Sequence, residues 1–208
     1  MSEPPTEKEA QSGDDALEQS LAPGFLVAAP SLLDPNFRQT LVLMAEHDEN
    51  GALGFVVNRP APITVGEMLG SIDEHLAQVA RASGRAEDRV FLGGPVQQNA
   101  LWILYERPSG EDVEGALPIG EHLALGTSRA LLERVVAKEG PAKVLFLLGY
   151  AGWSPRQLER ETVEGSWVPL DLQEDLVFDV AVEKRWEEAV QRLGFSPGAF
   201  IVNPTGEA

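Results

Sequence analysis

The sequence predicts an α+β fold, a single compact domain with a mixed, largely antiparallel sheet flanked by helices. Short apolar runs follow one another closely and are separated by turn residues, as in paired strands. Segments with apolar residues at every third or fourth position interleave with these runs and indicate helices. Residues 143–148 are almost continuously apolar, as expected of an interior strand covered on both faces.

Five further strands are expected in the first half of the chain. Residues 25–29, 40–45 and 53–57 are the first three, and the stretch HDENGA carries the turn between the last two. Residues 89–92 and 100–105 are expected to form another pair, joined by GGPVQQN.

Helices are expected in three regions besides the one that follows Ser154. Thr64 and Glu67 have the spacing of a capping box, and residues 73–82 continue in helix-forming residues. Between residues 127 and 140 the apolar side chains fall on one face, and Gly-Pro stops the helix. A last helix covers residues 186–193, before a terminating glycine.

The stretch GYAGWSPRQLERE, residues 149–161, is predicted to form a sharp corner. The apolar strand ends at Gly149, and a helix leaves after Ser154. Ser154 can cap this helix while Gln157 reaches back to it, and Pro155 suits the first helical position.

A strand-to-helix corner of this kind can bind phosphate at the helix N-terminus. No GxGxxG or GxxxxGK[ST] pattern accompanies it, however, and Ser154 already uses part of the N-terminal donor set. The favoured interpretation is a structural corner whose glycines let Tyr150 and Trp153 fold back onto the sheet.

Residues 1–20 are expected to form a disordered acidic leader, because they contain few large apolar groups. Residues 21–208 are expected to form one domain, in which residues 107–120 read as a loop. The N-terminus has no apolar signal segment, and no apolar run approaches the roughly 18–20 residues of a membrane span. Cysteine is absent, which excludes disulfides and thiol chemistry. We expect a cytoplasmic protein with no membrane association.

The chain is strongly acidic, with a net charge of −17. The leader accounts for five of these charges, which leaves −12 on residues 21–208. Nucleic-acid binding depends on Lys and Arg that neutralise phosphates and release counterions. Direct binding to nucleic acid is therefore not expected, whereas an unknown protein partner or small ligand is compatible with the acidity.

Four blocks stand in the order GFLVAAPSLLDPNFRQTLVLMAEHDENGALGFVVNRP (24–60), VFLGGPVQQNALWILYE (90–106), GYAGWSPRQLERE (149–161) and SWVPLDLQEDLVFD (166–179). Together they resemble the AlgH/YqgE family of bacterial proteins. The resemblance spans about residues 21–195 and implies a compact α/β fold. Members of the family are often labelled transcriptional regulators, a label that came from genetic association, so the resemblance implies this role as well. The sequence departs from the family pattern in its leader, in the acidic loop after Tyr105 and at LWILYE, where members often carry an aromatic residue and a histidine.

Catalytic motifs are absent from the sequence. There is no GxSxG, and the three histidines are too far apart for HxH or HExxH metal binding. We expect no catalytic residue, no metal and no cofactor. His47 lies between Glu46 and Asp48 at a strand end, where an imidazole can act as a general base. The favoured interpretation is a turn residue hydrogen-bonded to the backbone.

Arg59 directly follows a buried strand and precedes Pro60. A planar guanidinium at this place can clamp a carboxylate or phosphate of a ligand with two hydrogen bonds. It can equally bind an internal acid such as Asp34 or Glu161. The sequence leaves both roles open.

A second glycine corner, Gly93-Gly94-Pro95, permits a positive φ or the close approach of another backbone. We predict that it meets residues 47–54, 58–59 and 150–153 around one pocket, with aromatic rings as walls. The candidate ligand-binding residues are His47, Asn58, Arg59, Gly93, Gly94, Pro95, Tyr150, Trp153, Ser154 and Gln157.

The sequence is compatible with three functions. The favoured one is a non-catalytic protein that binds a ligand or a protein partner and has a regulatory role. The first alternative is a transcriptional regulator that contacts DNA directly, for which residues 128–138 and 154–164 are the candidate helices. The second is an enzyme that acts on a small anionic substrate through His47, Arg59 and Tyr150.

Overall fold

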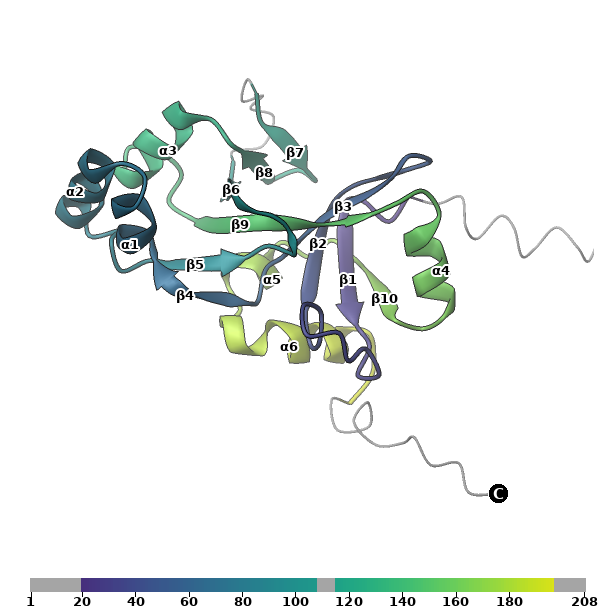
Figure 1. Cartoon of the computed structure of the whole chain (residues 1–208). Helices are drawn as coiled ribbons and strands as arrows, with labels where there is room; N and C mark the ends of the chain where they lie inside the picture. Colours follow the sequence, from purple (N-terminus) through teal and green to yellow (C-terminus); the bar gives the residue numbers. More distant parts are fainter. Residues whose placement is uncertain (1–19, 108–114, 197–208) are drawn as a thin grey trace, which may run out of the picture.

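The computed structural model describes residues 20–107 and 115–196 of the 208-residue chain (Figure 1). The expected acidic leader up to residue 19, the middle of the expected loop at 107–120 and the end of the expected domain from residue 197 lie outside the described residues. Within the described ranges, no helix is both long and apolar enough to span a membrane.

Ten strands form the described part of the sheet. They are β1 (Gly24–Ala28), β2 (Leu41–Asp48), β3 (Gly51–Val56), β4 (Pro60–Thr64), β5 (Arg89–Leu92), β6 (Val96–Glu106), β7 (Leu117–Ile119), β8 (Leu123–Gly126), β9 (Val144–Trp153) and β10 (Trp167–Asp171). The helices are α1 (Val65–Gly70), α2 (Glu74–Ser83), α3 (Arg129–Val136), α4 (Gln157–Val163), α5 (Asp175–Phe178), the 3-10 helix η2 (Val182–Lys184) and α6 (Arg185–Arg192).

The predicted fold class is confirmed. The sheet is curled and has the order β10-β1-β2-β3-β9-β6-β8-β7, while β5 pairs with β9 and β4 with β5. All pairs of neighbouring strands are antiparallel except β5 and β9. The chain is therefore a single compact α+β domain with a mixed, largely antiparallel sheet.

Strands β5 and β6 do not pair with each other, so this part of the sequence prediction is wrong. Both pair with β9, β5 in parallel and β6 antiparallel. The connection after β5 crosses the β9 backbone at close range: the Gly93 amide donates to the Leu148 carbonyl at 2.8 Å, and a Cβ on Gly94 would collide with the backbone of Tyr150. The crossing requires glycines, because a side chain here would collide with the β9 backbone. This agrees with the close approach of another backbone expected from the sequence.

Strand β9 does not end at Gly149, as the sequence suggests, but continues to Trp153. Gly149 has a φ of +71°, and a Cβ there would lie 2.6 Å from the Val96 carbonyl oxygen. The glycine therefore accommodates an irregularity within the strand. Beyond it, Ala52 of β3 pairs with Trp153, so the second half of β9 joins β3.

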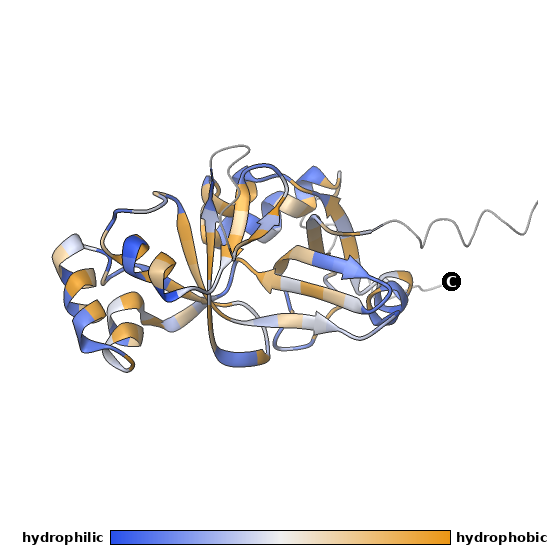
Figure 2. Ribbon diagram, turned by 90° about the horizontal axis from the view of Figure 1, so that it is seen from above, coloured by the Kyte–Doolittle hydropathy of each residue, from blue (hydrophilic) through white to orange (hydrophobic). Residues whose placement is uncertain are grey.

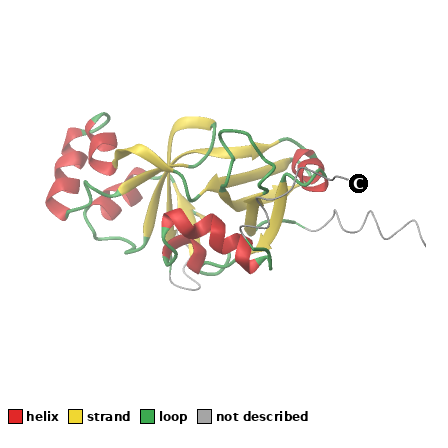
Figure 3. Cartoon of the chain, turned by 90° about the horizontal axis from the view of Figure 1, so that it is seen from below, coloured by secondary structure: helices red, strands yellow, loops and turns green. Residues whose placement is uncertain are grey.

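Helices cover the sheet in separate groups (Figures 1 and 3). The helices α1, α2 and α3 lie together at one end, α5 and α6 lie along the sheet, and α4 lies at the opposite end. Hydrophobic residues run along the central strands, whereas hydrophilic residues colour the outward turns of the helices (Figure 2). Leu145 and Leu147 of β9 belong to the core beside α6, and Phe146 belongs to the core beside α1–α3. The prediction that this strand is buried on both faces is confirmed.

The start of α1 shows how local sequence determines a helix boundary. The Thr64 side chain accepts from the Glu67 amide, and the Glu67 carboxylate accepts from the Thr64 amide at 2.8 Å. This is the expected capping box, which satisfies two of the free N–H groups at the helix N-terminus.

Candidate functional site

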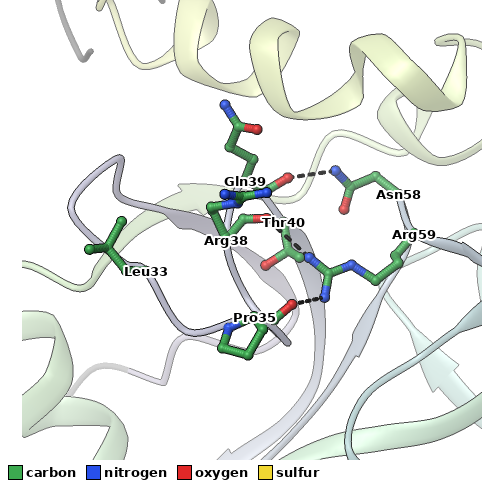
Figure 4. A pocket seen from close by; sticks show the side chains of 7 residues that line it. All are labelled: Leu33, Pro35, Arg38, Gln39, Thr40, Asn58 and Arg59. Carbon is green, nitrogen blue, oxygen red and sulfur yellow. Dashed lines mark hydrogen bonds between the residues drawn. The ribbon is translucent and has the colours of Figure 1, made fainter. Parts of the chain in front are cut away.

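A hollow of about 420 Å³ lies between the loop of residues 33–40, called here the 33–40 loop, and the end of β3. Figure 4 shows the side chains from these two segments, with Arg59 reaching across to the loop. The hollow is lined by Leu33, Pro35, Arg38, Gln39, Thr40, Asn58 and Arg59. Its volume is that of a small-molecule site.

The 33–40 loop is folded by its own hydrogen bonds. The Asp34 carboxylate accepts from the Asn36 amide at 2.7 Å, and the Asp34 carbonyl accepts from the Arg38 amide at 2.8 Å. Buried Thr40 then donates its hydroxyl to the Phe37 carbonyl at 2.7 Å. Short polar side chains that bind the nearby backbone in this way favour turns over regular structure.

Asn58 joins this loop to the sheet. Its Oδ1 accepts from the Leu41 amide at 2.9 Å, and its Nδ2 donates to the Gln39 carbonyl, also at 2.9 Å. Both ends of the amide are therefore engaged within the protein, and Figure 4 shows the bond to Gln39. Asn58 thus shapes the hollow by holding the 33–40 loop against the sheet.

Arg59 also holds the loop. Its Nη1 donates to the Pro35 carbonyl at 2.6 Å and its Nη2 to the Arg38 carbonyl at 3.1 Å. The acid considered from the sequence, Asp34, acts on Arg59 only as a nearby charge. Partial burial, and then the neighbouring Arg38 cation, lower the pKa of Arg59 below its usual value, and Asp34 offsets part of this effect.

Two lining side chains are not engaged. Within the described ranges, neither the guanidinium of Arg38 nor the side-chain amide of Gln39 takes part in a hydrogen bond or an ion pair. Both residues are exposed on the 33–40 loop and appear at the hollow in Figure 4. The two arginines are also the charged residues of the lining.

Trp153 lies next to this loop, in an aromatic cluster with Phe37 and Trp167. Its ring stacks on Phe37 at a centroid distance of 6.3 Å and meets Trp167 edge-on at 5.8 Å. The Glu161 carboxylate accepts from both indole N–H groups, at 2.9 and 2.8 Å, and from the Gln157 side chain at 2.8 Å. Glu161, which the sequence offered as a partner for Arg59, instead ties α4 to β9 and β10.

The start of α4 differs from the sequence prediction. The helix begins at Gln157, after Arg156 in a left-handed conformation with a φ of +60°, and has no side-chain cap. Ser154 therefore does not cap the helix, and Pro155 is not its first residue. The Gln157 side chain does reach back, because its Oε1 accepts from the Ser154 amide at 3.0 Å. Continuation of β9 to Trp153 leaves a tight turn in place of the expected cap.

The sequence predicted that Tyr150 and Trp153 wall one cleft. The structure shows that they cannot. Tyr150 meets Trp102 at the core beside α6, whereas Trp153 belongs to the cluster beside α4. The two rings are three residues apart in an extended strand, so they project from opposite faces of the sheet. Trp153 is also buried, with 6% of its surface exposed.

His47 is bound within the protein. Its Nδ1 accepts from the Leu21 amide at 2.9 Å, and its Nε2 lies 3.7 Å from a Glu159 carboxylate oxygen. An Nδ1 that accepts a hydrogen bond carries no proton, so the ring is in the Nε2–H form. These contacts agree with the structural interpretation of His47 and place it outside the lining of the hollow.

Of the ten residues proposed from the sequence, Asn58 and Arg59 line the hollow. Segments 51–54, 93–94 and 150–153 are neighbours in the sheet but contribute nothing to this lining. Sequence reasoning missed the whole 33–40 loop, which supplies the other five lining residues. The stretch DPNFRQT, with its Asp-Pro-Asn turn signal beside an arginine, is the signal that could have identified it.

A second hollow of about 500 Å³ is lined by Glu106, Arg107, His122, Pro141, Ala142 and Glu174. Its charged residues have both signs, and two of its carboxylates are bound within the protein: Glu174 accepts from the His122 backbone amide, and Glu106 pairs with Lys143 outside the lining. In the part of the chain that the structure describes, no three His, Asp or Glu side chains are grouped so as to hold a metal ion.

The curled sheet, its α1–α3 end and the hollow beside β3 define the class of protein: a small α+β domain with a hollow at a strand end. The chain belongs to the AlgH-like family, whose model matches residues 25–198. The resemblance seen in the sequence is thereby confirmed.

Relatives of similar length are similar over most of the chain. A UPF0301 protein of Anaeromyxobacter dehalogenans is 60% identical and covers 89% of this chain and 94% of its own length. A UPF0301 protein of Photobacterium profundum is 36% identical over 86% of this chain and 94% of its own.

Two solved structures have a similar fold. The solution structure of the AlgH protein from Pseudomonas aeruginosa has a TM-score of 0.71 and 34% identity, and covers 91% of this chain and 97% of its own. The crystal structure of protein DIP2367 from Corynebacterium diphtheriae has a TM-score of 0.66 and 23% identity, and covers 86% of this chain and 90% of its own. At that identity the second comparison supports the fold alone.

Proposed function

We propose that this protein is a non-catalytic binding protein whose ligand site is the hollow between the 33–40 loop and the end of β3. One observation carries the proposal. The bonds that hold the hollow open are made within the protein, by Asn58 and Arg59, while the side chains of Arg38 and Gln39 remain available to a ligand. A site formed before its ligand arrives avoids part of the ordering cost of binding.

The chemistry of the lining supports binding over catalysis. Thr40 is the only hydroxyl among the seven lining residues, and it already donates to the Phe37 carbonyl. The lining contains no carboxylate and no imidazole that could accept a proton near neutral pH. An arginine remains charged and cannot act as a general base there.

A regulatory role has physical support in the position of Phe37. This residue belongs to the 33–40 loop, and its ring meets Trp153 and Trp167. A ligand that shifts the loop would change the packing of this aromatic cluster beside α4. Such a change could alter a surface read by a protein partner, in a cytoplasmic setting as the sequence suggests.

The proposal is tested by a thermal-shift screen of a metabolite library at pH 7, because a ligand that binds the native state raises its apparent stability. Hits are expected to shift the backbone amide NMR signals of residues 33–40 and 58–59. Leu33→Trp, at a lining residue that is 77% exposed, is expected to weaken these hits by crowding the hollow. Ile72→Trp, at a 65% exposed position outside the lining, is the matched control.

Each hit should also be recovered chemically unchanged after prolonged incubation, as judged by one-dimensional NMR. Conversion of a hit to product would favour the enzyme alternative. If Leu33→Trp and Ile72→Trp change the affinity for the hits equally, the hits bind elsewhere. The hollow is then not the ligand site.

A further inference from the structure

We infer that the hollow recognises an oxyanion, a carboxylate or phosphate group of a small acidic molecule, through Arg38 and Arg59. This inference rests on the proposed function and specifies the class of ligand. It follows from the balance of donors and acceptors in the lining, from the charges around it and from its apolar rim.

The hollow offers more hydrogen-bond donors than acceptors. Arg38 presents its five N–H groups, and the amide of Gln39 adds two. Arg59 uses one hydrogen of each terminal nitrogen on the Pro35 and Arg38 carbonyls, which leaves its Nε–H and one hydrogen on each terminal nitrogen. A complementary ligand must therefore supply acceptors, and oxyanions supply the most acceptors in the least volume.

Two cations meet at this place although the protein as a whole is acidic. The charges of Arg38 and Arg59 oppose each other: burial is the main cause that lowers the pKa of Arg59, and the nearby Arg38 cation is the second. Some of the other exposed arginines bind carboxylates, such as Arg89 with Glu183 and Arg129 with Asp73, both at 2.7 Å. In contrast, no described carboxylate forms an ion pair with Arg38. An anion in the hollow would relieve this repulsion.

A third cation lies behind the same end of β3. Arg185 of α6 is 4% exposed and donates to the carbonyls of Val57 and Val180. Burial lowers its pKa to about 10, and the acid that offsets this effect, Glu183, is itself paired with Arg89. The positive charge of Arg185 is therefore compensated mainly by carbonyl oxygens, and it adds to the positive potential near the end of β3.

The rim of the hollow is apolar on the loop side. Leu33 and Pro35 line it and are exposed. A small acid with an apolar portion would place its anionic group between the two arginines and its apolar portion against Leu33. Arg38 is the side chain free to form a paired contact with the oxyanion, because two hydrogens of Arg59 already hold the loop.

The test is an NMR titration of the full-length protein with inorganic phosphate, sulfate, acetate and, as a neutral probe, acetamide, in a buffer low in chloride. The expected result is saturable movement of the Arg38 and Arg59 Nε–H signals with the anions and none with acetamide. Preference for phosphate and sulfate over acetate would indicate a tetrahedral group, and the reverse preference a carboxylate.

Arg38→Gln removes the free guanidinium and leaves the bonds of Arg59 in place. We expect it to weaken anion binding about tenfold or more, the effect of losing one charge-assisted contact. Arg38→Lys should restore part of the affinity, since it returns the charge without the planar geometry. Arg160→Gln removes an equal charge from an exposed position on α4 and should leave binding unchanged.

The outcomes separate the two proposals. Equal weakening by Arg38→Gln and Arg160→Gln, or shifts that never saturate, would overturn the oxyanion inference. A different outcome is that library hits bind at residues 33–40 while phosphate, sulfate and acetate neither bind nor compete. In that case the proposed binding function stands, and the inference that the ligand carries an oxyanion is wrong. If no compound of any charge perturbs residues 33–40, both proposals fail.

Discussion

Asn58 and Arg59 have separate roles at the end of β3. Asn58 connects the Leu41 amide and the Gln39 carbonyl through the two ends of its side-chain amide, so it contributes to the shape of the 33–40 loop. Arg59 fixes the same loop through two carbonyls and still has donors left. Residue identity alone does not reveal this division, because both side chains are common ligand-binding residues.

Asn58→Ala is predicted to destabilise the protein by about 1–3 kcal/mol, the usual cost of leaving a buried polar group without its partner. The group in question is the amide of Leu41, whose residue is fully buried. Urea unfolding at pH 7 measures the change. Asn99→Ala, at an exposed position of β6, is the matched control and should cost less than about 0.5 kcal/mol. An Asn58 variant as stable as the Asn99 variant would contradict the assigned role.

Glu161 was considered from the sequence only as a partner for Arg59. The structure gives it three donors from other residues, the indoles of Trp153 and Trp167 and the amide of Gln157. These residues belong to β9, β10 and α4, so their convergence depends on how the elements pack. No local pattern in the sequence encodes it.

At the scale of elements, α5 and α6 are joined by a two-pronged ion pair. Arg192 donates to both oxygens of Asp175, at 2.9 and 2.7 Å, and these hydrogen bonds hold the pKa of Asp175 below its usual value of 3.8. A carboxyl with a lowered folded-state pKa stabilises the fold above its unfolded-state pKa. That contribution is lost as the pH falls through the lower, folded-state value.

We predict that the coupling between Asp175 and Arg192 is present at pH 7, is smaller than about 1 kcal/mol because the pair is partly exposed, and vanishes as the pH falls well below 3.8. A double-mutant cycle with Asp175→Asn and Arg192→Gln, measured by urea unfolding across this range, isolates the pair from the other contacts of Arg192 with Gln173 and Glu188. A coupling energy that does not change with pH would contradict the assignment.

Several elements were predictable because their signals are local. The β2–β3 hairpin, the capping box of α1 and the central position of β9 follow from turn residues, spacing and apolar runs. Four strands were not identified: β4, β7, β8 and β10. Strand β4 has the sequence PAPIT, and two prolines in five residues argue against a strand. The structure explains them, because β4 is an edge strand that pairs with β5 and with no other described strand.

At the scale of the whole molecule, the candidate DNA-contacting helices mix cations with carboxylates on a strongly acidic chain. In α3, Arg129 pairs with Asp73 and Glu133. In α4, Arg160 lies in the sequence QLERETV, among acidic residues. A recognition helix needs arginines or lysines free to meet phosphates and bases.

We therefore predict no sequence-selective binding to duplex DNA, even at low salt, where electrostatic attraction is strongest. A gel-shift series between about 20 and 200 mM salt, with genomic fragments and scrambled duplexes of equal length, measures this. Selective retardation of a genomic fragment would restore the alternative of a regulator that contacts DNA directly.

The sequence by itself determined the family, the α+β class and the helices and strands with strong local signals, because capping, turns and periodicity act over a few residues. It also pointed to Asn58 and Arg59. Only the tertiary structure decided that β9 separates β5 from β6, that Tyr150 and Trp153 face opposite ways, and that the 33–40 loop completes the hollow. These features depend on contacts between segments distant in the chain, and their hydrogen bonds and packing form only when the sheet closes around them.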